Sequence, residues 1–232
     1  MKDFTIDTIK SICTKHTVHG GEPKLPFGIP FLDIRMDEYQ AKWNGHHSYY
    51  HVLKAIAEEL KPSIVLEVGT WTGTSAACFA AGNPSCEVLT IDHHSDGPAD
   101  LENRERLYEA VKEYPGIKYF QGCSTERVAK EKPGTRCVFD DVVKFLDGRK
   151  IDILWIDGWH LAVMAQADFD TYFPLMNRPS LLICDDLCGG SSATIGGMQD
   201  FWKGLPGREE DKYLDGAIHS GYPVGLIRYG GE

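Results

Sequence analysis

Three aspartates and one histidine follow two apolar stretches of the chain, in positions where they could act together. In order they are Asp157, His160, Asp185 and Asp186. In a parallel α/β sheet the ends of such strands face one crevice, so we expect these three carboxylates and the imidazole to converge where ligands bind. Crowded carboxylates repel one another and raise each other's pKa, so the group favours a bound cation.

Oxygen ligands from Asp157, Asp185 and Asp186 suit Mg²⁺, with Mn²⁺ or Ca²⁺ as substitutes, and we predict these residues as metal ligands. The alternative is that each aspartate only caps the helix after its strand, and for Asp157 by itself this is the better interpretation. His160 has an ordinary pKa of about 6.5, so it is mostly neutral at pH 7 and could accept a proton. Its alternative role is a solvent-facing histidine at a helix start.

Length and composition limit the classes of protein to consider. With 232 residues, of which 42% are hydrophobic, the chain can bury one substantial core, so we expect a single domain. A formal net charge of −10 and a pI near 5.4 argue against a nucleic-acid partner. The seven cysteines include no C-x-x-C pair, which favours reduced thiols. Neither a signal-peptide core nor an apolar run of about 18 residues occurs, so we expect a cytoplasmic protein with no membrane partner.

Short apolar strands alternate with helical repeats along most of the chain. The predicted strands are 64–68, 88–91, 117–120, 151–156 and 181–184, followed by two final strands near 213–219 and 223–229. The predicted helices are 4–13, 48–60, 74–81, 101–114, 137–147, 160–173 and 198–203. This order predicts an α/β fold with a Rossmann-like, doubly wound, mainly parallel sheet and a C-terminal antiparallel strand pair.

Two segments fall outside this alternation. Residues 1–45 contain the first helix and a Gly/Pro-rich passage, which we interpret as an N-terminal helix and lid segment before a core of residues 46–232. The Gly/Ser-rich segment 188–197 follows the aspartate pair and is a candidate second lid, with an ordinary surface loop as the alternative.

A glycine-containing turn after the first predicted strand indicates a nucleoside site. Glu67 and Gly69 begin this turn, Ser75 lies at the start of the next helix, and Asp92 ends the second strand. Glycine permits close backbone approach, and an acid at the end of the second strand can accept hydrogen bonds from ribose hydroxyls. A dinucleotide fingerprint would need glycine where this chain has Trp71, which weakens the pyrophosphate interpretation.

The chemistry of the turn favours a ligand without phosphate. Glu67 would repel phosphates but suits a cationic or amine-bearing ligand. S-adenosylmethionine (SAM) carries a sulfonium, an amine and a ribose but no phosphate. The alternative is a glycine turn with a purely structural role.

These motifs together resemble class I SAM-dependent methyltransferases. Within that group the chain is similar to the small metal-dependent O-methyltransferases typified by catechol O-methyltransferase. The similarity is carried by Trp43 to Gly69, Thr90 to Asp92, Gly122 to Ser124 and Asp152 to Asp186. It covers most of residues 43–186 and leaves both ends uncovered. The resemblance implies one methyltransferase domain over residues 1–232, with SAM and a divalent cation, Mg²⁺ in the first place, as cofactors.

Carried over position by position, the resemblance assigns roles to individual residues. The implied cofactor contacts are Glu67, Gly69 and Ser75 to the methionine part, Asp92 and His93 to the ribose, and Ser124 to the adenine side. The resemblance also implies that Asp157, Asp185 and Asp186 bind the metal, and Asp157 is assigned to the cofactor as well. Trp159 matches an aromatic residue that walls the substrate pocket, although a core or rim aromatic is the alternative.

Two positions depart from the catechol enzymes. His160 stands where those enzymes carry a lysine base, and Asp186 stands where they often have asparagine. The metal-dependent sugar O-methyltransferases of antibiotic biosynthesis share the I-D-G and D-D pattern. These enzymes and cephalosporin hydroxylase-like relatives keep the substrate class open.

We therefore predict an enzyme that transfers a methyl group from SAM to a hydroxyl of a small molecule with adjacent oxygens, using a divalent metal and His160 as base. The alternative is a catalytically silent SAM-binding protein of the same fold, or a cephalosporin hydroxylase-like relative. An NAD-dependent oxidoreductase is disfavoured by Trp71 and Glu67. A homodimer is left open, and the sequence does not name the methyl acceptor.

Overall fold

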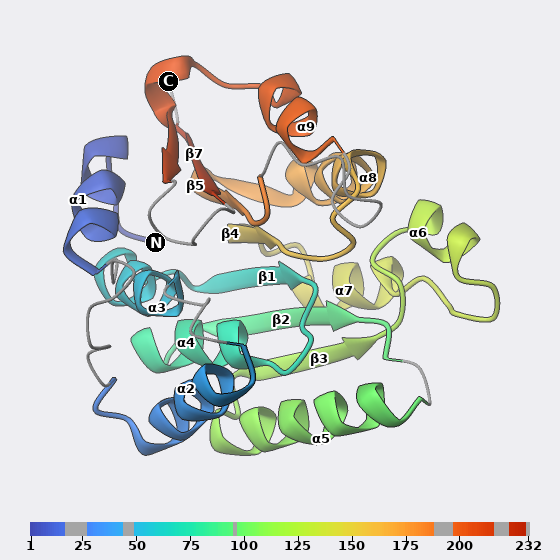
Figure 1. Cartoon of the computed structure of the whole chain (residues 1–232). Coiled ribbons are helices and arrows are strands. Elements are labelled where there is room, and N and C mark those ends of the chain that lie inside the picture. The colour runs from blue at the N-terminus through green and yellow to red at the C-terminus, as the bar shows by residue number, and fades with distance from the viewer. Residues whose placement is uncertain (17–26, 44–48, 95–96, 188–196, 216–222, 231–232) are drawn as a thin grey trace.

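One seven-stranded sheet organises the chain, in the order β3-β2-β1-β4-β5-β7-β6 (Figure 1). The computed structural model describes residues 1–16, 27–43, 49–94, 97–187, 197–215 and 223–230. The strands are β1 (Ile64–Val68), β2 (Glu87–Asp92), β3 (Ile117–Gln121), β4 (Ile151–Ile156), β5 (Met176–Cys184), β6 (Lys212–Asp215) and β7 (Val224–Tyr229). Neighbouring strands among β1 to β5 pair in parallel, and β7 pairs antiparallel with both β5 and β6. The predicted fold class is therefore confirmed.

Helices cover both faces of this sheet (Figure 1). The long helices are α1 (Ile6–His16), α2 (Pro30–Trp43), α3 (Tyr49–Leu60), α4 (Thr74–Gly82), α5 (Pro98–Glu113), α7 (Phe139–Leu146) and α8 (Ala162–Tyr172). The short ones are α6 (Glu126–Glu131), α9 (Met198–Gly204), and the 3₁₀ turns η1 (Phe173–Leu175) and η2 (Glu209–Asp211). No described helix is long and apolar enough to cross a membrane.

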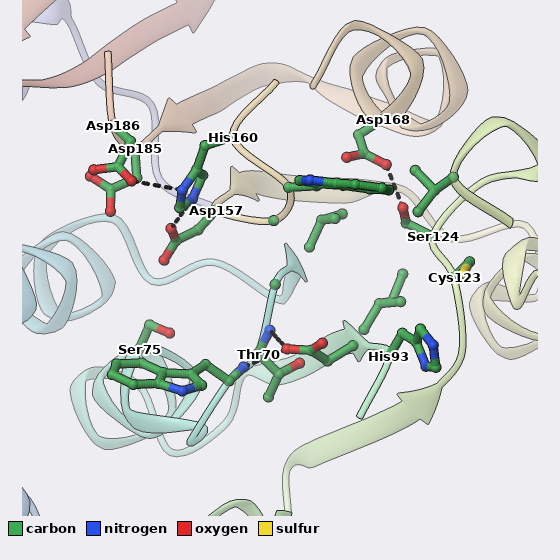
Figure 2. Close-up of a pocket in the computed structure, with 18 of the residues that line it drawn as sticks. Thr70, Ser75, His93, Cys123, Ser124, Asp157, His160, Asp168, Asp185 and Asp186 are labelled. Atoms are coloured by element: carbon green, nitrogen blue, oxygen red, sulfur yellow. Dashed lines mark hydrogen bonds and ion pairs between the residues drawn. The ribbon is translucent and has the colours of Figure 1, made fainter. Parts of the chain in front are cut away.

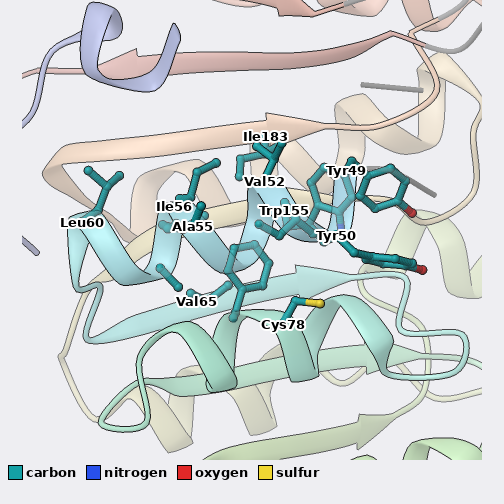
Figure 3. Close-up of a cluster of buried hydrophobic side chains, with 14 of the residues drawn as sticks. Tyr49, Tyr50, Val52, Ala55, Ile56, Leu60, Val65, Cys78, Trp155 and Ile183 are labelled. Carbon is teal, nitrogen blue, oxygen red and sulfur yellow. The ribbon is translucent and has the colours of Figure 1, made fainter. Parts of the chain in front are cut away.

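Successive side chains of a strand point to opposite faces, so each buried strand feeds two cores. On β4, Trp155 packs with α3 and α4 on one face, and Leu154 packs with α7 and α8 on the other. Figure 3 shows the first core, where Val52 and Ile56 of α3 meet Trp155 and Ile183 from the sheet. Strands that are apolar on both faces suit a parallel sheet covered by helices on both sides.

The predicted strands and helices agree with these bounds to within three residues at each described end, apart from three larger differences. The helix α2 was not predicted, although Pro30 at its first position is a typical helix-start residue. The helix α6 was missed because it buries no residue, and its signal is Thr125, whose hydroxyl caps the amide of Val128. The strand β5 begins at Met176, five residues before the prediction, because polar residues and Pro179 hide its first half.

Some predictions fall on residues that the structure does not describe. Residues 188–196 of the candidate second lid lie outside the described residues, as do residues 216–219 of the first C-terminal strand. The division of the chain at residue 45 stays a prediction, and so does the cytoplasmic location.

Candidate active site

A cavity of about 430 Å³ lies at the carboxyl ends of β1 to β5. Residues that follow each of these five strands line it, as expected for an open α/β sheet. The predicted site residues in its wall are Gly69, Ser75, Asp92, His93, Ser124, Asp157, Trp159, His160, Asp185 and Asp186. Figure 2 shows Asp157, His160 and the aspartate pair at one end of the cavity and Ser124 at the other.

The turn after β1 brings two strand ends into backbone contact. Gly69 has φ +95°, and a Cβ atom there would lie 2.0 Å from the carbonyl oxygen of Asp157. Only glycine permits this approach. Oδ2 of Asp92 accepts the amides of Thr70 (2.9 Å) and Trp71 (2.6 Å) and so fixes the turn. Trp71 has φ +46°, so the backbone keeps a glycine-like conformation although the side chain is bulky.

Glu67 lies behind the cavity wall. The hydroxyls of Ser75 and Thr90 donate to its two carboxylate oxygens, and its side chain is fully buried. Burial raises the pKa of Glu67 to about 8, although the two hydrogen bonds oppose this rise. Ser75 is among the described residues that line the cavity and Glu67 is not, so Glu67 reaches the cavity through Ser75.

His160 stands between two of the predicted metal ligands. Its Nε2 is 3.2 Å from Oδ1 of Asp157, and its Nδ1 is 2.7 Å from Oδ2 of Asp186. Burial disfavours the imidazolium, but hydrogen bonds and charge from both aspartates outweigh this and raise the pKa of His160 to about 11. The expectation of a mostly neutral imidazole is therefore wrong for the site as it stands, because the sequence does not show that two carboxylates flank the ring.

Two of the aspartates carry raised pKa values. Burial raises the pKa of Asp157 and of Asp185, the charge of Asp186 raises both further, and His160 opposes both rises. The capping alternative fails for Asp157, because the N-cap of α8 is Leu161 and no side chain caps it. His160 accordingly lies before the helix, which begins at Ala162 and not at residue 160 as predicted.

The cavity is rich in acidic side chains. The carboxylates that line it in the described part of the chain are Asp92, Asp157, Asp168, Asp185 and Asp186. Against them stand Lys132, whose Nζ lies 4.9 Å from the ring centre of Trp159, and the two histidines His93 and His160. No group of three or more His, Cys, Asp or Glu side chains in the described ranges is already arranged to hold a metal ion.

The far end of the cavity is built by Ser124 and its neighbours. The hydroxyl of Ser124 donates to Oδ1 of Asp168 at 2.5 Å, and its carbonyl oxygen accepts from the hydroxyl of Tyr172 at 2.6 Å. Nε2 of His93 lies 2.9 Å from the hydroxyl of Thr135. Burial raises the pKa of Asp168 to about 7, and the bond from Ser124 opposes that rise.

Comparison with known proteins agrees with this geometry. The sequence model of a methyltransferase domain family matches residues 66–187. The chain belongs to this methyltransferase family. A search among curated proteins gave no significant match.

Solved structures resemble this methyltransferase over nearly its whole length. An O-methyltransferase from Bacillus cereus in complex with S-adenosylhomocysteine (SAH) has 12% identity and a TM-score of 0.59, over 96% of this chain and 97% of that one. A SAM complex of a Streptomyces achromogenes O-methyltransferase involved in tomaymycin synthesis has 14% identity and a TM-score of 0.60, over 97% of this chain and 96% of that one. An SAH-bound methyltransferase from Podospora anserina has 16% identity and a TM-score of 0.60, over 100% of this chain and 99% of that one. At these identities the likeness establishes the fold.

Several residues that line the cavity of the methyltransferase were not singled out from the sequence. Tyr49 and Tyr50 stand near the start of the predicted helix 48–60, and both line the cavity. Asp168 lies inside a helical repeat, where an acid usually indicates the solvent face. Its buried carboxylate is paired with Ser124, which is 44 residues away in the sequence. The sequence around Asp168 therefore gives no sign that this residue lines the cavity.

Proposed function

We propose that SAM is the cofactor of this methyltransferase. The observation that carries the proposal is one acidic cavity with a glycine turn at β1, a carboxylate at the end of β2 and a hydroxyl after β3. A cavity of about 430 Å³ falls within the range of small-molecule sites, and its carboxylates suit a sulfonium and an amine better than a phosphate. Two of the similar structures hold SAH and a third holds SAM, which supports the same choice.

The roles that we assign to the residues come from the resemblance and are consistent with their places along the cavity wall. Gly69 and Ser75 contact the methionine part, with Glu67 behind Ser75. Oδ2 of Asp92 already accepts hydrogen bonds from two backbone amides, so we assign Oδ1 to the ribose hydroxyls. His93 borders the ribose and Ser124 the base.

We further propose that the methyl acceptor is a hydroxyl of a small molecule with adjacent oxygens, and that Asp157, Asp185 and Asp186 hold a divalent cation. The three carboxylates lie at the same end of the cavity, and oxygen donors of this kind fit Mg²⁺. A cation bound there would lower the pKa of the acceptor hydroxyl and fix its orientation.

His160 is the base in this proposal. It can accept a proton only as neutral imidazole, and the charges of Asp157 and Asp186 now hold its pKa near 11. A bound cation would neutralise these carboxylates and so remove the negative charge that raises the pKa of His160. The proposal that His160 is the base therefore depends on the proposal that a cation is bound.

Two other candidates keep specific support. A catalytically silent SAM-binding protein would use the same cavity with His160 as a permanent imidazolium. A cephalosporin hydroxylase-like relative would share the aspartate motifs. An NAD-dependent oxidoreductase would need room for a pyrophosphate where Trp71 stands.

Two experiments separate these candidates. Calorimetry with SAH and with NAD should show tight binding of SAH alone, and binding of NAD alone would overturn the cofactor assignment. Transfer of labelled methyl from SAM to a panel of catechols and sugar diols, with and without EDTA, then tests the reaction.

We expect EDTA and the Asp186→Ala substitution each to abolish transfer while SAH still binds. Full turnover under both conditions would remove the cation from the mechanism. SAH binding with no transfer to any acceptor would favour the silent binding protein.

A further inference from the structure

The packing of the fold does not explain why a carboxyl group stands at position 168. Asp168 is 1% exposed on the inner side of α8, and it lines the cavity. Its Oδ1 accepts from Ser124, and Figure 2 shows its second oxygen pointing away from Ser124, at the end of the cavity opposite the aspartates near His160. A buried carboxyl is costly, which the rise of its pKa to about 7 reflects.

The loop that carries Ser124 is anchored without Asp168. Tyr172, one helical turn further along α8, donates to the carbonyl oxygen of Ser124 at 2.6 Å. Thr125 caps α6 through the amide of Val128, and the amide of Cys123 donates to the carbonyl oxygen of Arg136. A neutral or apolar residue would therefore suffice at position 168 if the loop were all that it served.

A nucleoside in this cavity would bring its base to Asp168. The ribose acceptor Asp92 ends β2, and Ser124 follows β3, so a base attached to that ribose extends toward the β3 side of the sheet. Cys123 and Val128 also line the cavity and offer apolar contact to a flat ring. In its ionised form, a carboxyl group at such a place accepts hydrogen bonds and gives none.

We propose that Asp168 is a specificity-determining residue that selects adenine by accepting a hydrogen bond from its exocyclic 6-amino group, with Ser124 holding the carboxylate in position. The inference rests on the proposed SAM function and adds a residue from α8 to its binding site. A 6-oxo purine would present an oxygen to the same carboxylate, which repels it.

The test compares the binding of SAH with that of S-inosylhomocysteine, in which a 6-oxo group replaces the amine, by calorimetry. Wild type should prefer SAH by about 10-fold to 100-fold, the range expected when a hydrogen bond to a charged group is lost. Asp168→Asn keeps an acceptor and gains a donor, so it should bring the two affinities within a few-fold or reverse them. Asp170→Asn, at an exposed position two residues along the same helix, should keep the wild-type preference.

The outcomes separate the two levels of the proposal. Equal affinities in wild type would overturn the role of Asp168 without any variant, and so would an unchanged preference in Asp168→Asn. Failure of wild type to bind either ligand would instead overturn the SAM function. A merely structural role of Asp168 would weaken both ligands equally and leave their ratio unchanged.

Discussion

The buried carboxyl of Glu67 should make the stability of the protein depend on pH in a way that one substitution removes. The folded protein holds the proton of Glu67 up to a pKa of about 8, whereas the ordinary value is 4.5. Between these values the unfolded chain has lost this proton and the folded chain has kept it. The free energy of unfolding must therefore fall as the pH rises from about 4.5 to about 8, and it does not change with this group outside that window.

The size of the effect follows from the pKa difference. Each unit of pKa shift corresponds to about 1.4 kcal/mol, so a shift from 4.5 to about 8 amounts to about 5 kcal/mol over the whole window. Glu67→Gln carries no titrating proton and has nearly the shape of the protonated acid. Its amide oxygen can accept from one of the two hydroxyls, Ser75 or Thr90, and its NH₂ group can donate to the other. We expect the variant to lie within about 1 kcal/mol of wild type near pH 5 and to exceed its stability by about 4 kcal/mol at pH 8.

Urea unfolding at pH 5, 6, 7 and 8, followed by tryptophan fluorescence, measures both proteins. Glu59→Gln is the matched control, because Glu59 is exposed on α3 and should show a flat difference from wild type. A flat difference for Glu67→Gln as well, within about 0.5 kcal/mol, the usual size of a surface effect, would refute the buried-proton argument.

Three further outcomes are expected. Asp92→Ala should weaken SAH binding by about 10-fold to 100-fold in calorimetry, because the acid serves both the turn and the ribose, and an unchanged dissociation constant would place the ribose elsewhere. His160→Gln should lower kcat by about 10²-fold to 10⁴-fold with SAH affinity nearly intact, and rates within a factor of about three would make His160 a bystander. Gly69→Ala should lower Tm far more than Gly134→Ala: both glycines have positive φ, +95° and +88°, but only at Gly69 would the new Cβ meet backbone. Equal losses in Tm would contradict the close approach of β1 to β4.

Much of the fold could be predicted from the sequence because local rules govern it. Buried parallel strands need apolar side chains on both faces, so runs such as Ile151–Ile156 are visible without any partner. Acids that directly follow such runs must meet at one edge of the sheet, which is why Asp157, Asp185 and Asp186 could be grouped in advance. The helices α2 and α6 gave no comparable apolar signal.

The chemistry of the site was decided only by the tertiary structure. The sequence determined which residues stand at the strand ends, but the pKa of a side chain depends on its burial and on charges that come from distant segments. His160 meets Asp157, three residues away, and Asp186, from the loop after β5, and the two together turn a neutral imidazole into a cation. Asp168 became part of the cavity only because α8 packs against the loop after β3, a contact that no local pattern encodes.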